Sequence, residues 1–149
     1  MTYQNTLIKN AVKHNAIILI STILLTFIVV ILLLTKTISV EPNVAFAHLL
    51  LKISIPATLF TFLCQIVFYK IYLKKLHKIK EAEEKLSFTL RLFSERLNAT
   101  LFPIALNIIF LCLTNFDMFL VLNVVLVLWM LNLFPFAEKI KTITGIKQP

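Results

Sequence analysis

The sequence contains very little glycine and cysteine. One of its 149 residues is a glycine, Gly145, and two are cysteines, Cys64 and Cys112. Gly-rich phosphate loops, dinucleotide fingerprints and GxxxG helix contacts need several glycines at fixed spacings, so the sequence excludes all three. The cysteines lie in separate apolar runs without CxxC or Cys/His spacing, which indicates neither a disulfide framework nor a metal site.

Ionisable residues are missing from the middle of the long apolar runs. Proton relays, voltage sensors and ion-coupled transporters need such groups inside a membrane. The histidines, His14, His48 and His77, are scattered and form no metal-ligand spacing. Since no motif indicates a reaction, we expect a protein that is not an enzyme and that has no catalytic residues, cofactor or metal ion.

Apolar residues are present in excess. They make up 59% of the chain, and the mean hydropathy of +0.91 lies outside the range of soluble globular proteins. A helix of about 20 uncharged residues is about 30 Å long and spans the hydrocarbon core of a bilayer. We therefore predict an all-α integral membrane protein, one domain over residues 1–149, with four transmembrane helices at about 16–35, 53–69, 97–113 and 118–136.

The most basic stretch, residues 70–96, lies between the second and third spans and holds eight of the fifteen Lys and Arg residues. No glycine or proline marks a turn in it. Lysines up to Lys80 suit a helix C-terminus, and the acidic residues from Glu81 onward suit a helix N-terminus. We predict a helical connector that reverses near Lys80 and Glu81, and residues 81–96 either lie on the membrane or extend the third helix.

Other signals predict how the helices begin. Residues 43–51 suit a short interfacial helix, and Pro56 then either kinks a longer second helix or lies in the first turn of one capped by Ser54. Residues 114–117 allow only an antiparallel hairpin between the third and fourth spans, with Asp117 as the N-cap.

The distribution of positive charge predicts the orientation. Thirteen of the fifteen Lys and Arg residues fall in the N-terminal segment, the connector and the tail, against Lys36 and Lys52 in the segment between the first two spans. The positive-inside rule places both termini in the cytoplasm. The predicted fold is two antiparallel hairpins joined by a basic helical cytoplasmic connector, in the bacterial inner membrane, with a frayed tail after Phe136.

Amides are the informative polar residues of the spans. Asn107 and Asn123 come out at nearly the same depth on either side of the 114–117 turn, and Gln65 and Asn132 share a level nearer the inner face. Such pairs hydrogen-bond between helices and hold a bundle together. The alternative is that one pair faces outward and recognises an intramembrane partner.

The formal charge of +8 favours anionic lipid over nucleic acid, because the basic residues flank apolar runs rather than line a folded face. We expect one group of connector lysines to hold the topology and to bind lipid headgroups, with docking of a cytoplasmic partner as the alternative. They are Lys70, Lys74, Lys75, Lys78 and Lys80.

In its length, span count, basic loops and Lys/Ile/Phe/Asn-rich composition, the chain resembles the inner-membrane entry-exclusion proteins of F-like conjugative plasmids (the TraS type). The resemblance lies in the profile of all 149 residues and not in a motif. It implies a recipient-cell protein that blocks redundant DNA transfer by recognising another membrane protein, a component of the donor mating channel.

The later half also resembles the immunity proteins against pore-forming colicins of the A type, with a basic loop, a helical hairpin and Leu133-Phe134-Pro135 followed by lysines. That resemblance implies helix-to-helix capture of an inserting toxin inside the bilayer. A non-catalytic subunit of a larger membrane complex is a third alternative, and a homo-oligomer is left open.

Overall fold

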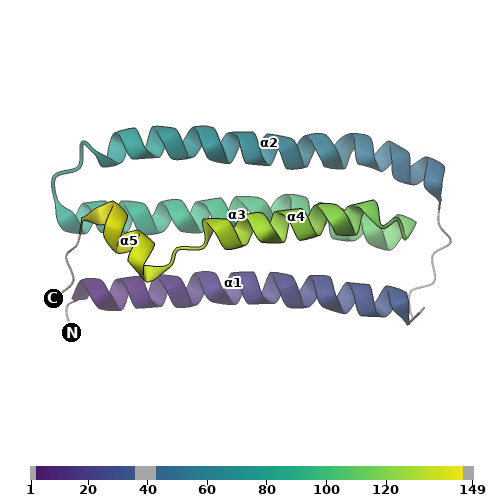
Figure 1. The fold of residues 1–149 in the computed structure, drawn as a ribbon, viewed down its shortest axis with the longest axis horizontal. Coiled ribbons are helices and arrows are strands. Elements are labelled where there is room, and N and C mark those ends of the chain that lie inside the picture. The colour runs from purple at the N-terminus through teal and green to yellow at the C-terminus, as the bar shows by residue number, and fades with distance from the viewer. Residues whose placement is uncertain (1–2, 36–42, 146–149) are drawn as a thin grey trace.

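The computed structural model describes residues 3–35 and 43–145, which form five α-helices and no strand. Four helices lie alongside one another, and the short fifth crosses one end of the bundle (Figure 1). In chain order the helices are α1 (Tyr3–Leu34), α2 (Val44–Leu76), α3 (Ala82–Thr114), α4 (Met118–Leu133) and α5 (Ala137–Thr144).

Three of these helices, α1, α2 and α3, are each long and apolar enough to cross a membrane. The helices α4 and α5 reach that standard together, as one span bent by 53°. The all-α membrane class is therefore confirmed, with three or four candidate spans among the described residues.

The long helices α1, α2 and α3 have 32 or 33 residues each, so they are about 50 Å long and exceed a bilayer core of about 30 Å. The predicted connector is consequently not a separate element. Its residues form the end of α2, a turn at 77–81 and the start of α3. The predicted reversal near Lys80 and Glu81 is confirmed. Of residues 81–96, Glu81 is the N-cap and the others extend the third helix.

Charge and backbone hydrogen bonds explain why α2 ends without a glycine. Lys74 and Lys75 occupy its last turn and Glu83 and Glu84 the first turn of α3, so both helix dipoles are favourably matched. The backbone N–H of His77 donates to the carbonyl of Leu73 over 3.2 Å and closes the helix end.

The start of α2 shows whether residues 43–51 form a separate helix and where Pro56 lies. Asn43 is the N-cap, and its side chain accepts from the backbone N–H of Phe46 over 3.0 Å. The helix then continues without a break, so residues 43–51 are not a separate interfacial helix. Pro56 lies inside α2, and the alternative of a helix first capped by Ser54 is wrong.

The turn between α3 and α4 is an antiparallel hairpin turn, as predicted. Asn115 adopts a left-handed conformation with φ of 46°, and its N–H donates to the carbonyl of Leu111 over 2.8 Å. Asp117 does stand at the N-cap position of α4, but its side chain makes no capping hydrogen bond.

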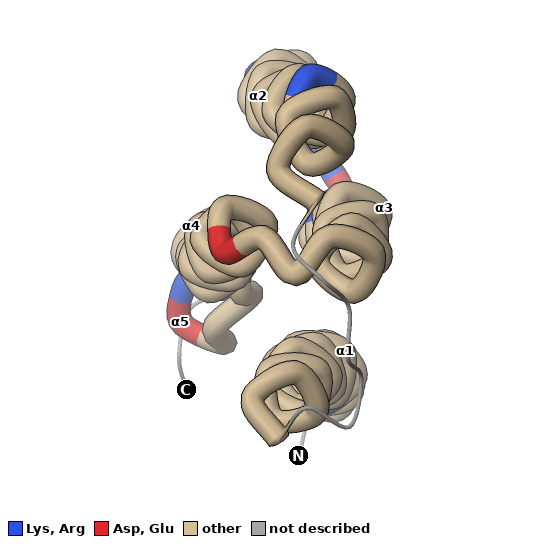
Figure 2. Tube along the Cα trace, turned by 90° about the vertical axis from the view of Figure 1, so that its right-hand side faces the viewer, with Lys and Arg blue, Asp and Glu red and all other residues tan. Residues whose placement is uncertain are grey.

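The predicted first hairpin is wrong, because α1 and α2 do not contact each other over the described residues. They lie on opposite sides of the pair formed by α3 and α4 (Figure 2). Instead, α3 touches every other helix, and its fully buried Leu97 belongs to the main core with Phe119, Leu126 and Met130 of α4. A tight turn ties α2 to α3, whereas the longer link between α1 and α2 can join helices that are not neighbours.

The part of the tail that the structure describes, residues 137–145, is not frayed, and residues 146–149 lie outside the described residues. α5 packs against α1 and α3, and Ile140 is fully buried in a small second core with Ile8, Leu86 and Phe93, which we call the α5 cluster. Gly145 ends the helix in a left-handed conformation with φ of 73°. The apolar spacing within a basic segment was the missed signal, because Ile140 and Ile143 fall at i, i+3 on one face and both pack in this cluster.

Candidate functional site

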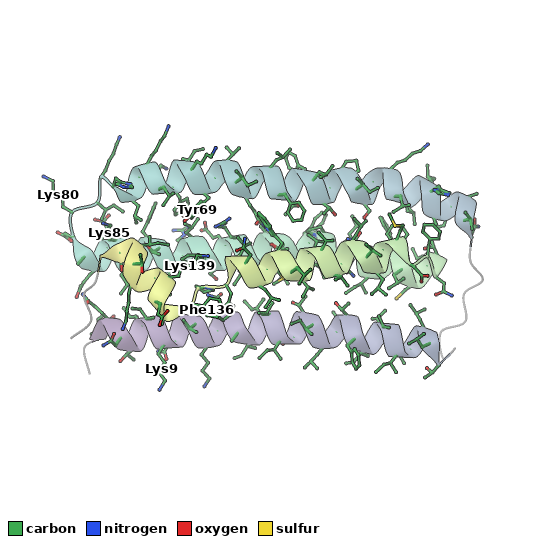
Figure 3. The ribbon with its side chains drawn as sticks, in the orientation of Figure 1. Lys9, Tyr69, Lys80, Lys85, Phe136 and Lys139 are labelled. Atoms are coloured by element: carbon green, nitrogen blue, oxygen red, sulfur yellow. The ribbon has the colours of Figure 1, made fainter. Side chains whose placement is uncertain are left out.

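Positive charge gathers at one end of the bundle, which we call the basic end. This end carries the start of α1, the turn between α2 and α3, and α5 (Figure 1). Figure 3 shows Lys9, Lys80, Lys85 and Lys139 there. Among the described residues, Lys52 is the one Lys or Arg residue in the half of the bundle away from the basic end. The five predicted headgroup lysines, Lys70, Lys74, Lys75, Lys78 and Lys80, are all exposed.

Gln65 joins three helices. Its side chain is buried on α2 and donates from Nε2 to the hydroxyl of Thr100, over 2.8 Å, and to the carbonyl of Arg96, over 3.1 Å, both on α3. Its Oε1 accepts the indole N–H of Trp129 on α4 over 2.7 Å. Asn132, the predicted partner at this level, has an exposed side chain, and only its backbone carbonyl is used, by the Lys139 ammonium over 3.0 Å.

Asn107 and Asn123 are both fully buried, but they do not hydrogen-bond to each other as expected. Asn107 accepts from the hydroxyl of Ser54 on α2, and its Nδ2 has no partner. Neither amide atom of Asn123 has a partner among the described residues. Equal depth does not bring the two side chains together, because α3 turns Asn107 toward α2.

A groove of about 360 Å³ opens between α2 and α3 toward the basic end. Its walls are mostly apolar and include Phe60 and Phe68 of α2 and Leu92 and Ala99 of α3. Tyr72, Glu95 and Arg96 supply its polar end. The groove therefore combines an aliphatic and aromatic trough with a charged head.

Of the two charged residues at the head of the groove, Glu95 has partners of opposite charge or hydrogen-bond donors, and Arg96 has no such counter-charge among the described residues. Glu95 is held by Arg91, with 2.7 Å between Nε and Oε1, and by the Tyr72 hydroxyl, which donates to Oε2 over 3.2 Å. No carboxylate of residues 3–35 and 43–145 pairs with Arg96. Its guanidinium carbon lies 4.5 Å from the centre of the Tyr69 ring, and its buried Nε has no hydrogen-bond partner among these residues. The head is therefore left with one uncompensated, half-buried cation.

Lys139 on α5 adds positive charge nearby. Its ammonium lies 5.6 Å from the centre of the Phe93 ring. Burial, and then the charge of Arg96, lower the pKa of Lys139 from its ordinary value. Because this ammonium also donates to the Asn132 carbonyl near the end of α4, Lys139 lies where α3, α4 and α5 meet at the basic end.

Sequence reasoning found Gln65, Asn107 and Asn123 but missed Arg96 and Trp129 as contact residues. A signal for Arg96 was present, because Tyr69 and Arg96 stand at the two boundaries of the connector, next to the second and third apolar runs. Such residues meet at one depth when the helices they border are antiparallel neighbours.

No family model, curated protein or solved structure matches this chain. The site is therefore interpreted from its own chemistry. Within residues 3–35 and 43–145, no three His, Cys, Asp or Glu side chains are placed to hold a metal ion. The groove and the exposed helix faces can bind apolar molecules, and the basic end can bind anions.

Proposed function

We propose that the chain crosses the bacterial inner membrane four times, with both termini in the cytoplasm. The distribution of charge supports this topology: of the thirteen Lys and Arg residues that the structure describes, twelve belong to segments at the basic end and one, Lys52, does not. α1 begins and α5 ends at that end (Figure 1), as an even number of spans requires. In this topology α4 with residues 134–136 forms the fourth span, and α5 lies at the cytoplasmic surface.

We further propose that the protein acts in the membrane by binding another membrane protein, as an entry-exclusion protein does when it recognises a donor mating-channel component and blocks redundant conjugative DNA transfer. The observation that carries this proposal is the exposure of α2. Large apolar side chains remain exposed along this helix, among them Leu63 at 62% and Val67 at 53%. A partner that packs on this face also meets the exposed lysines that follow it.

Recipient cells that express the chain provide the test. We expect the conjugation frequency from a donor with a related F-like plasmid to fall relative to recipients without it. A double variant on the exposed α2 face, Leu63→Ala with Val67→Ala, weakens the effect. The matched control on α1, Leu24→Ala with Ile28→Ala, removes side chains of similar exposure and leaves exclusion intact. Unchanged conjugation frequency with the wild-type chain contradicts the proposal.

Immunity against a pore-forming bacteriocin is the second candidate, and the separation of α1 from α2 favours it. Each of these helices has a long exposed apolar face onto which an inserting toxin helix can pack. Survival of expressing cells under pore-forming colicins distinguishes this role from exclusion. A role as a non-catalytic subunit of a larger complex predicts no effect in either assay and co-purification with fixed partners.

A further inference from the structure

The groove between α2 and α3 is not filled by side chains of the described residues, although it is lined by large apolar groups such as Phe60, Phe68 and Leu92. Its volume of about 360 Å³ lies in the range of ligand pockets. The lining residues Phe60 and Phe68 are exposed at the surface of the bundle, so bilayer lipid has access to the groove in the membrane topology proposed above, on which this inference rests.

The charges at the head of the groove favour an anion. Glu95 is already engaged by Arg91 and Tyr72, so it does not neutralise Arg96. Arg96 instead rests on the Tyr69 ring with a buried Nε that lacks a hydrogen-bond partner. A half-buried cation without a counter-charge is costly, and a phosphate group supplies both charge and hydrogen-bond acceptors.

The position of Arg96 next to an apolar run indicates which kind of molecule supplies such a phosphate. Arg96 is the last charged residue before the third apolar run, 97–113, and Tyr69 is the last residue of the second, 53–69. Arg and Tyr at such positions lie at the headgroup level of a bilayer. A phosphate at this depth that also has an apolar tail alongside Phe60 and Phe68 belongs to a phospholipid.

We propose that this groove is a binding site for one anionic phospholipid, whose phosphate contacts Arg96 and whose acyl chain lies between α2 and α3. Basic pockets between transmembrane helices on the cytoplasmic side bind anionic headgroups in this way. The site differs from the exposed lysines at 70–80, which attract the membrane surface as a whole. It does not depend on whether the protein acts in exclusion or in immunity.

The test uses the full chain purified in detergent and native mass spectrometry. We expect phosphatidylglycerol to bind more tightly than phosphatidylcholine with the same acyl chains. Arg96→Gln lowers the affinity for phosphatidylglycerol about tenfold, as expected for the loss of one charge-assisted hydrogen bond. It lowers the affinity for phosphatidylcholine less, because the choline ammonium of that lipid already offsets the charge of its phosphate. The control Lys9→Gln removes an exposed cation at the same end, on α1 and outside the headgroup lysines (Figure 3), and changes neither affinity.

A second variant keeps the positive charge of Arg96 and fills the apolar part of the groove. Ala99 lines the groove and is exposed, so Ala99→Phe is compatible with the fold. This variant weakens the binding of both lipids, because the phenylalanine ring occupies the part of the groove in which the acyl chain lies. Circular dichroism and the fluorescence of Trp129 verify the fold of each variant. If Arg96→Gln does not fold, Ala99→Phe alone decides, since unchanged lipid binding by that variant overturns the proposal.

Three other outcomes overturn the site. Equal losses in Arg96→Gln and Lys9→Gln show a diffuse attraction to surface charge. Equal affinity of the wild-type chain for both lipids removes the role of the headgroup. Protection of the groove by a bound protein helix, with no lipid retained, assigns the groove to a protein partner.

Discussion

The indole N–H of Trp129 on α4 donates to the side-chain oxygen of Gln65 on α2 over 2.7 Å, and the same amide donates to Thr100 on α3. The tilted contact between the rings of Trp129 and Phe62, at 4.9 Å between centroids, lies beside this bond. One glutamine thus fixes how α2 is rotated against the pair formed by α3 and α4.

Removal of this amide tests the connection. Gln65→Leu leaves Trp129 and Thr100 without their interhelical partners, and we expect the free energy of unfolding to fall by about 1–3 kcal/mol. Because Trp129 is the only tryptophan, its emission reports the change directly. Thr26→Val is the control, since the Thr26 hydroxyl bonds only to the Thr22 carbonyl in its own helix, over 2.9 Å. Unfolding in a denaturing detergent measures both, and equal losses contradict the prediction.

The two buried asparagines of α3 and α4 respond in opposite ways to the same substitution. Asn107→Leu removes the acceptor of the Ser54 hydroxyl, and we expect the free energy of unfolding to fall by about 1–2 kcal/mol. Asn123→Leu replaces an amide that has no hydrogen-bond partner, so it leaves stability unchanged or raises it by about 1 kcal/mol. The same detergent unfolding measures both variants. A clear loss with Asn123→Leu shows that a polar group outside the described contacts binds Asn123.

The α5 cluster makes the C-terminal segment resistant to proteolysis. Ile140→Ala removes a fully buried side chain, and we expect it to cost about 2–4 kcal/mol at this contact and to release α5. Trypsin then cuts at Lys139 and Lys141 much faster than in the wild type. The exposed Thr142 is the matched position, because its hydroxyl bonds only to Glu138 in the same helix, over 2.8 Å. Rapid cleavage of the wild type or of Thr142→Ala contradicts a packed tail.

The orientation is tested with reporters at the two ends of the bundle. We expect a reporter that works only in the cytoplasm to be active when it is fused after Gly145. A reporter that works only in the periplasm is expected to be active when it is fused to a chain truncated after Asn115, in the turn between α3 and α4. The reason is the concentration of positive charge at the basic end. The reverse pattern of activities contradicts the topology.

Much of the architecture follows from the sequence, because charge-free runs near 30 Å permit little except helices in lipid. The opposed charges around residues 80 and 81 were sufficient to predict the reversal. The neighbours of each helix were not predictable in this way. A span that is apolar on every side has no periodic signal to show which face meets another helix, and this is why the α1–α2 hairpin was wrong.

The candidate site was predictable in part. Polar residues within apolar runs identified Gln65 and Asn107 as buried contacts. Their partners were not identified, because the direction in which a side chain points depends on helix rotation, and one turn carries four possible directions. Ser54 was considered only as a cap, and its role as the partner of Asn107 appears once α2 is seen to begin at Val44.

The separation of α1 from α2 bears on biogenesis. Over the described residues, every helix that contacts α2 is synthesised after it, and the first helix that α1 contacts is α3. We therefore expect α1 to remain without a helical neighbour until α3 has been translated. A gene split in the linker between α1 and α2, with both fragments co-expressed, should for this reason still yield the assembled bundle.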